Sequence, residues 1–273
     1  MKIYDCFSYW DEDLLLDLRL SILNDYVDYF VIVEGNKTWQ NNPKKLQFDI
    51  EKFKNFKDKI IYIPVNDMPE GKNPWTRENF QRNCIERGLI NAKQEDWIII
   101  SDLDEIPNLG MLHHFKKEMR YAVFKQNQYY YKLNLQAEKN PYWYGSRICV
   151  KKYLKSPQWL RNLKFKKRAF WRIDKFRLNH ILLEGGWHFC NLKTAENLLY
   201  KYQNLCETND PYIFKEKIDI KKLNLKNIEE KILTGKDIID RDEVYKVKKL
   251  DRTFPEKILS DQEKFKEWIV FKE

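Results

Sequence analysis

Short continuous apolar runs alternate with segments of helical spacing over the first hundred residues. The apolar runs occupy residues 2–7, 29–33, 59–64 and 97–100. Runs of this length without polar alternation predict strands that are buried on both faces of a sheet. From Leu14 to Leu23, leucine and isoleucine recur every three or four residues, which predicts an amphipathic helix. A second helix is predicted over residues 76–89, with Thr76 as its N-cap.

The order of these elements predicts an α/β fold. The succession strand, helix, strand, strand, helix, strand is typical of a mostly parallel sheet with helices on both faces. A helix over residues 109–119 and a strand over residues 121–124 continue it. The lysine-rich tail from about residue 218 predicts a basic helical extension. We therefore expect a main domain at 1–215 and an extension at 216–273 that packs on it or follows it.

Composition and cysteine spacing narrow the class of protein. The chain has 273 residues, of which 43% are hydrophobic, enough for a substantial core, and only 8 are glycine, which disfavours glycine-rich phosphate loops. Its five cysteines are widely spaced without a Cys-x-x-Cys pair, so we expect reduced, mostly buried thiols. Neither the start nor any later segment has an apolar run of signal-peptide or membrane-spanning length, and we expect a cytoplasmic location.

The net charge of +9 suits nucleic acid, anionic lipid or an anionic small substrate. The lysines are spread along the chain and no nucleic-acid motif accompanies them, so we expect no nucleic-acid partner, although a basic nucleic-acid-binding protein stays an alternative. The basic stretch 221–249 is either a solvated helical face or a peripheral contact with the inner membrane face and a lipid-linked acceptor.

An acidic motif follows the strand predicted at residues 97–100. Asp102 and Asp104 come at the carboxyl end of this strand, where loops and helix N-termini converge in open α/β sheets. Residues two apart in extended backbone project to the same side, so both carboxylates can face one hard cation such as Mg²⁺ or Mn²⁺. The alternative is that the turn merely caps the next helix.

The motif also carries a family resemblance. Ile99-Ile100-Ser101-Asp102-Leu103-Asp104-Glu105-Ile106-Pro107 resembles the signature of glycosyltransferase family 17, which includes β-1,4-mannosyl-glycoprotein N-acetylglucosaminyltransferases. Four further blocks match the family in order, at residues 16–20, 27–34, 75–82 and 185–189. The chain departs from many relatives at residues 41–43 and at Cys190, where a serine is common. We also expect it to lack the membrane anchor and stem of the Golgi enzymes.

The resemblance implies a GT-A-like, Rossmann-type fold and an inverting, metal-dependent glycosyltransferase. Its donor would be a nucleotide-sugar, with a UDP-sugar favoured and N-acetylglucosamine as one candidate sugar, and its acceptor a glycan or glycolipid. The implied cofactor is Mn²⁺ or Mg²⁺, which would neutralise charge on the leaving diphosphate. Asp104 would be the direct metal ligand, while Asp102 would touch the ribose or a metal-bound water.

Two residues of the block at 185–189 gain roles from the resemblance. His188 would reach the metal or the diphosphate from the far side of the crevice, although a lone histidine is commonly a hydrogen-bonded structural residue. Trp187 would stack on a sugar face, unless it is a buried core residue. The tyrosines and tryptophans at residues 129–131, 142–144 and 159 have the same two interpretations.

Three further residues are expected to bind the donor. Glu34 ends a predicted strand at the same sheet edge and would accept hydrogen bonds from the base or ribose; its alternative is an ion pair with Arg19. Arg77 and Arg82 lie five apart on the second predicted helix, so that one would bind diphosphate while the other packs or pairs. Arg82 is the favoured diphosphate ligand.

An inverting transfer needs a carboxylate that takes the proton of the acceptor hydroxyl. Glu184, directly before Gly185-Gly186, is the candidate, and Glu105 is the reserve, unless it only supplies charge at a helix N-terminus. Two other enzyme classes compete with this interpretation. A haloacid-dehalogenase-like phosphatase also uses Asp-x-Asp, but on its first strand, and a nucleotidyltransferase would need an amino-terminal glycine-rich loop.

Overall fold

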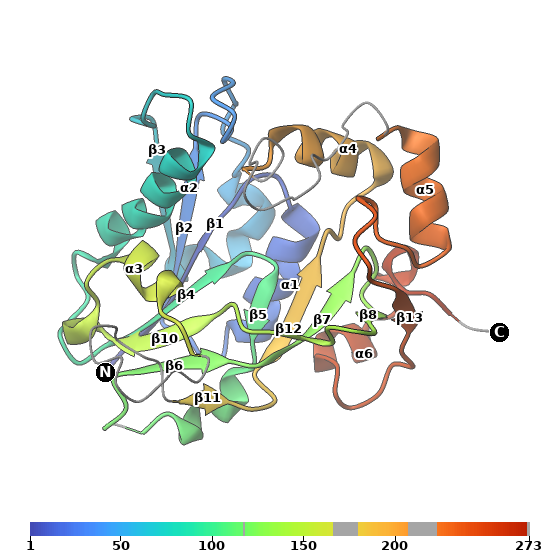
Figure 1. Cartoon of the computed structure of the whole chain (residues 1–273). Coiled ribbons are helices and arrows are strands. Elements are labelled where there is room, and N and C mark those ends of the chain that lie inside the picture. The colour runs from blue at the N-terminus through green and yellow to red at the C-terminus, as the bar shows by residue number, and fades with distance from the viewer. Residues whose placement is uncertain (117, 166–179, 207–222, 272–273) are drawn as a thin grey trace, which may run out of the picture.

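A computed structural model describes residues 1–116, 118–165, 180–206 and 223–271 (Figure 1). Within them, the larger of two sheets has the strand order β11-β6-β10-β4-β1-β2-β3. Its strands are β1 (Ile3–Ser8), β2 (Tyr29–Gly35), β3 (Ile60–Val65), β4 (Trp97–Asp102), β6 (Tyr121–Phe124), β10 (Arg147–Val150) and β11 (Ile181–Leu182). Strand β10 is antiparallel to both neighbours, and the other adjacent pairs are parallel. The prediction of a mostly parallel sheet is confirmed.

Helices cover both faces of this sheet. Neighbouring strand residues point to opposite faces, so Phe7 and Ile32 pack on one side with helix α1 (Asp13–Leu23). Cys6 and Val31 pack on the other side with the 3₁₀ helix η2 (Cys84–Leu89) and with α3 (Pro157–Asn162). The sequence predicted this arrangement, because strands without polar alternation must be buried on both faces.

A second sheet lies beside the first, in the order β13-β8-β7-β12-β5, with β9 paired to β7 (Figure 1). Its strands are β5 (Glu105–Pro107), β7 (Gln126–Tyr130), β8 (Leu135–Ala137), β9 (Tyr142–Trp143), β12 (Gly186–Cys190) and β13 (Tyr245–Val247). Strand β5 follows β4 after a two-residue turn and pairs with β12. The acidic motif therefore connects the two sheets.

Two of the predicted helices differ in their details. Helix α2 (Pro74–Asn83) begins earlier than predicted, because Asn73 and not Thr76 is its N-cap and accepts a hydrogen bond from the Trp75 backbone N–H at 3.0 Å. Residues 84–89 then continue as η2 rather than as α-helix. The helix predicted over residues 109–119 is only the short 3₁₀ helix η3 (Leu109–His114). It ends before Phe115, whose buried ring packs edge-on against Trp97.

The carboxyl-terminal part, which we predicted to be a basic helical extension, contains a strand as well as helices in its described residues. Its described elements are α5 (Leu225–Leu233), β13, α6 (Glu256–Ser260) and the 3₁₀ helix η7 (Lys266–Trp268). Strand β13 extends the second sheet, and buried Ile228 and Tyr245 join Tyr131 in one apolar cluster. The predicted boundary at 215/216 and the start of the basic stretch at Lys221 lie outside the described residues. The two-domain division therefore stays a prediction.

Three elements complete the description: η1 (Ile50–Lys59), η4 (Lys151–Tyr153) and α4 (Ala195–Asn204), which packs near α5. In the described part of the chain, no helix has the length and apolar character that crossing a membrane requires. None of the five cysteines forms a disulfide, and Cys190 is half-buried while the other four are buried. This agrees with the prediction of mostly buried thiols.

Candidate active site

The acidic motif lies at the carboxyl end of the parallel strands, as predicted. Asp102 is the last residue of β4 and pairs in register with Ser8, the last residue of β1. The turn that follows is closed locally, because the Glu105 Oε2 atom accepts a hydrogen bond from the Asp102 backbone N–H at 3.0 Å. The motif is thus a tight turn between two strands and does not cap a helix.

A buried ion pair binds the backbone of this turn, and we call it the supporting cluster. It consists of Asp5 on β1 and Arg19 on α1, whose side chains are both fully buried and meet at 2.6 and 2.8 Å. The Arg19 Nη1 atom also donates to the backbone carbonyls of Asp102 and Leu103 at 3.1 Å and of Glu105 at 2.7 Å. The alternative that paired Arg19 with Glu34 is wrong.

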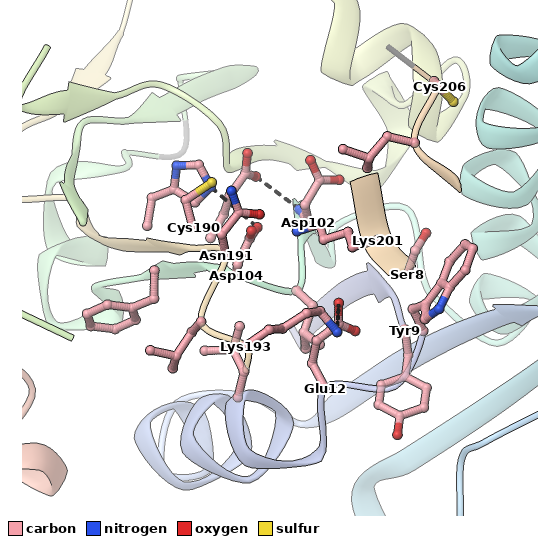
Figure 2. Close-up of a pocket in the computed structure, with 18 of the residues that line it drawn as sticks. Ser8, Tyr9, Glu12, Asp102, Asp104, Cys190, Asn191, Lys193, Lys201 and Cys206 are labelled. Carbon is pink, nitrogen blue, oxygen red and sulfur yellow. Dashed lines mark hydrogen bonds and ion pairs between the residues drawn. The ribbon is translucent and has the colours of Figure 1, made fainter. Parts of the chain in front are cut away.

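Strand β12 brings a distant segment to the turn. His188 pairs with Glu105 in the antiparallel β12–β5 ladder, and the Phe189 backbone N–H donates to the Asp104 carbonyl at 2.9 Å. Because His188 and Cys190 are two residues apart in a strand, their side chains project to the same face. The His188 Nε2 atom lies 3.5 Å from Asp104 Oδ1. The potential ligand atoms of Asp104, His188 and Cys190 all lie within 4.8 Å of one another. Figure 2 shows Asp104 and Cys190 close together.

The charges of Asp104 and His188 stabilise each other. Burial would by itself raise the pKa of the Asp104 carboxyl, but the neighbouring imidazolium outweighs burial and lowers this pKa. Burial likewise opposes protonation of His188, yet the Asp104 carboxylate raises the pKa of the imidazole well above its ordinary value. Among the described residues, the buried Nδ1 atom on the other side of the ring has no hydrogen-bond partner. A cation beside Asp104 would take the place of the Nε2 proton of His188.

A second group of charges surrounds the other end of the turn, and we call it the cavity cluster. Its members are Glu78 and Arg82 on α2, Arg161 on α3, Asp102 and Glu105. The Asp102 carboxylate accepts from Arg82 at 3.1 Å and from Arg161 at 2.7 Å. Burial alone would raise the pKa of this carboxyl, but the two guanidinium groups hold it well below its usual range. Asp102 is therefore an anion already held in place.

Glu105 is the most enclosed member of the cavity cluster, with 1% of its surface exposed. Its Oε1 atom accepts from the Trp143 indole at 2.6 Å and from Arg161 at 3.0 Å, and its Oε2 atom accepts from Arg161 at 2.7 Å. A Cβ atom at position 145 would collide with this carboxylate, which explains Gly145. Both oxygens of Glu105 already accept hydrogen bonds. Glu105 is therefore suited to holding the turn and Arg161 in place rather than to accepting a proton from a substrate.

Two adjacent cavities open at the motif. The first, of about 280 Å³, is lined by residues at the ends of β1 and β4 and by β12, and Figure 2 shows Ser8, Asp104 and Cys190 among them. Trp10 and Trp39 also line it. The second, of about 1250 Å³, lies beyond the cavity cluster. Five residues line both cavities: Glu78, Arg82, Asp102, Trp143 and Arg241. Asp102 therefore lies at the boundary that the two cavities share.

Two predicted donor ligands lie outside both cavities. The buried Glu34 carboxylate accepts from Lys44, from the backbone N–H groups of Gln47 and Phe48 and from the Tyr62 hydroxyl, so it fixes the loop after β2. The buried Arg77 donates to two backbone carbonyls at 2.6 Å and joins two loops. Their surroundings argue against contact with nucleotide. Arg82, the favoured arginine, does line both cavities.

The positions of Trp187 and Glu184 also argue against their predicted roles. Trp187 faces away from His188 because strand residues alternate, and its indole is buried in the core and donates to the Thr253 carbonyl at 2.8 Å. Glu184 is exposed and precedes the end of β12 that is remote from Cys190. It lines neither cavity, and so the structure does not bring it to Asp104.

Three cavity residues did not feature among the predicted site residues. Arg161 contacts both Asp102 and Glu105 across 56 to 59 positions of sequence, and nothing in its own segment indicates this. Lys193 is buried and pairs with Asp11 and Glu12 after β1. The sequence could have indicated the position of Cys190, because this residue stands two positions after His188 in a segment that forms a strand, and both side chains then project to the same face.

The residues at the motif fit a divalent cation. Asp104 offers an oxygen, His188 a nitrogen and Cys190 a sulfur, and these are the ligand types that proteins use for divalent metals. The Nε2 atom of His188 faces Asp104 at 3.5 Å, so this ring nitrogen is the one available to the ion. Asp102 lies two residues from Asp104 and faces the same cavity.

Comparison with known proteins gives a consistent result. The sequence model of glycosyltransferase family 17 matches residues 1–257. The chain is similar to β-1,4-mannosyl-glycoprotein 4-β-N-acetylglucosaminyltransferase of Homo sapiens, at 24% identity over an alignment that covers 68% of this chain and 40% of the human protein. The proteins of that name from Rattus norvegicus and Mus musculus are also 24% identical, with 39% of each covered. The chain thus spans about two fifths of the length of these relatives.

Proposed function

The chain belongs to glycosyltransferase family 17 and is a glycosyltransferase, and on this premise we propose that it transfers N-acetylglucosamine from a UDP-sugar to a glycan, with inversion and with a divalent metal. The family assignment replaces the phosphatase, nucleotidyltransferase and nucleic-acid alternatives. One observation carries the proposal: Asp102, Asp104 and His188 meet at the carboxyl ends of parallel strands and face one cavity.

The metal would be held by Asp104 and His188, next to the anionic Asp102. A bound divalent ion supplies Lewis-acid neutralisation of the charge that builds on a leaving diphosphate. The protein's own contribution is to hold donors where that charge develops. Carboxylates of the turn fix both Arg82, which is buried, and Arg161, whose side chain is 11% exposed. Arg82 lines both cavities, and Arg161 lines the larger one. Guanidinium groups positioned in advance bind phosphate oxygens with little reorganisation.

The smaller cavity suits the nucleotide part of the donor. Trp10 and Trp39 line it beside the end of β1, with ring centroids 5.2 Å apart. Aromatic faces of this kind bind nucleobases by stacking. Trp39 Nε1 is buried and has no hydrogen-bond partner in the described part of the chain, which leaves a donor for a polar group of the nucleotide.

The larger cavity suits the acceptor glycan. Its volume of about 1250 Å³ exceeds the roughly 300–1,000 Å³ of common small-ligand sites, and it adjoins the smaller cavity at Asp102. Tyr142 and Trp143 line it with rings that are 47% and 39% exposed, which suits stacking on pyranose faces. Arg147 also lines it, and within the described residues its guanidinium reaches only the carbonyls of Gly145 and Leu163.

Thermal stability with and without ligands tests the proposal. We expect UDP-N-acetylglucosamine plus Mn²⁺ to raise the Tm of the full chain, because a ligand that binds only the folded state stabilises it. The rise should be smaller without the metal. In Asp104→Asn the metal-dependent part of the rise should be lost.

Asp67→Asn is the matched control, since Asp67 is an exposed carboxylate that pairs with Arg87 and lines neither cavity. This variant should retain the full metal-dependent rise. The donor assignment fails if a panel of other nucleotide-sugars stabilises the chain and UDP-N-acetylglucosamine does not. An unchanged rise in Asp104→Asn would refute the metal ligand. The cytoplasmic location and the peripheral membrane contact stay predictions.

A further inference from the structure

The half-buried thiol of Cys190 lies in the metal-binding group and not merely near it. Strand β12 is hydrogen-bonded on both sides, to β5 and to β7, and the Cys190 carbonyl accepts from the Tyr131 backbone N–H at 2.9 Å. The direction of the Cys190 side chain is therefore fixed by the sheet. It projects to the same face as His188, toward Asp104 (Figure 2).

The spacing of the three side chains suits one shared ion. Their potential ligand atoms all lie within 4.8 Å of one another. Ligands that bind one ion at about 2.0–2.3 Å lie at most about 4.6 Å apart. The group is therefore already close to the spacing that shared coordination requires.

The imidazole of His188 is oriented toward the same position. Its side chain is 9% exposed, and its Nε2 atom lies 3.5 Å from Asp104 Oδ1. This ring nitrogen, the Asp104 carboxylate and the Cys190 sulfur are ligand types that divalent ions such as Zn²⁺ take in proteins. Aspartate, histidine and cysteine together leave a coordination position open for an oxygen of the substrate, as three-ligand catalytic metal sites do.

We propose that Cys190 binds the metal through its sulfur as a third protein ligand and that it shifts the ion preference of the site from Mg²⁺ toward Zn²⁺ and Co²⁺. The inference rests on the metal site of the proposed function. On binding, a sulfur–metal bond forms and the thiol proton passes to solvent, without any change of oxidation state. Thiolate is a soft ligand that favours Zn²⁺-like ions, whereas a site of oxygen ligands alone suits Mg²⁺ or Mn²⁺.

Cobalt spectroscopy on the metal-free full chain tests this directly. Co²⁺ bound to thiolate gives a sulfur-to-cobalt charge-transfer band in the near ultraviolet, separate from the visible ligand-field bands that any bound Co²⁺ produces. We expect both kinds of band in the wild type. In Cys190→Ser the charge-transfer band should disappear while visible bands remain.

Cys206 provides the matched control, because it is the other cysteine that lines the same cavity. Cys206→Ala should keep the charge-transfer band. The wild-type spectrum also tests the proposal without any substitution, so a poorly folded variant cannot hide the result. Visible bands without a charge-transfer band in the wild type would overturn the role of Cys190. A charge-transfer band that persists in Cys190→Ser would overturn it as well.

Competition between Mg²⁺ and Zn²⁺ for the metal-free chain measures the ion preference of the site. We expect the ratio of the Mg²⁺ and Zn²⁺ dissociation constants to fall by at least about tenfold in Cys190→Ser, since even outer partners of metal ligands alter affinity by 10- to 100-fold. An unchanged ratio would overturn the selectivity. If Co²⁺ produces no visible bands at all, the metal site of the proposed function fails too, and this outcome differs from the failure of Cys190 alone.

Discussion

The acidic turn contacts two clusters of charged side chains, which differ in how fully their polar atoms are hydrogen-bonded. In the supporting cluster, the Arg19 guanidinium contacts both oxygens of Asp5 and three backbone carbonyls, and neither side chain is exposed. In the cavity cluster, the Asp102 side chain is 39% exposed, and the Nε atom of buried Arg82 has no hydrogen-bond partner among the described residues. One cluster is fully satisfied by the protein itself. The other has polar atoms that face a cavity.

This difference separates structural from ligand-binding charges by their hydrogen bonds rather than by their residue types. Both clusters contain arginine and aspartate, and both contact the same turn. A satisfied buried network fixes a conformation, whereas unpaired polar groups beside a cavity leave hydrogen bonds for a ligand. We therefore expect loss of stability when the supporting cluster is broken and loss of binding when the cavity cluster is broken.

The largest effect on stability is expected for Arg19→Met. Removal of one partner leaves the Asp5 carboxylate buried without its counter-charge, which typically costs about 3–5 kcal/mol. Urea unfolding would measure the loss. The double variant Asp5→Leu/Arg19→Met should recover part of it, because no charge then remains buried. A loss below about 1 kcal/mol in the single variant would contradict the supporting role.

A smaller loss of stability is expected for Arg161→Met, about 1–3 kcal/mol, because Asp102 keeps its contact with Arg82, and buried Glu105 keeps the Trp143 indole and the Asp102 backbone N–H as donors. This variant should also weaken stabilisation by UDP-N-acetylglucosamine plus Mn²⁺. Arg87→Met, which breaks an exposed pair with Asp67, is the control and should change neither quantity by much. If Arg161→Met destabilises as strongly as Arg19→Met and binds donor normally, the two clusters do not differ as we infer.

The smallest effect is expected for Glu184→Gln, outside both clusters. Glu184 is exposed and lines neither cavity, so the free energy of unfolding should change by no more than about 0.5 kcal/mol. The kcat for sugar transfer should be unchanged. A large fall in kcat with unchanged stability would restore Glu184 as the catalytic base.

The sequence predicted the parallel half of the fold because its signals are local. Strands β1, β2, β3 and β4 are apolar runs, and the position of Asp102 at a strand end follows from them. The second sheet was missed because β7 carries Gln126 and Gln128, which weaken the apolar pattern, although both side chains are buried by tertiary packing. Propensity and pattern are weak guides where burial depends on distant segments.

The site was predicted where a residue's role follows from its place on a strand and missed where it depends on partners. His188 meets Asp104, but neighbouring Trp187 points into the core, a difference that the two-residue period of strands explains. Glu34 does end a strand at the same edge, but Lys44 and the 47–48 backbone satisfy its carboxylate. No local pattern reveals the contacts of Arg161, which comes from a separate helix.

The register in which β12 pairs with β5 determines whether the candidate active site can form. A slip of one residue would turn His188 and Cys190 away from Asp104 and present Trp187 and Phe189 to the cavity instead, because every side chain changes face. The same slip would expose two large aromatic rings that now belong to the core. The register of β12 is therefore required for the site to form. A chain with the wrong register cannot bring His188 and Cys190 to Asp104, and its exposed aromatic rings make it a target for chaperones and proteases.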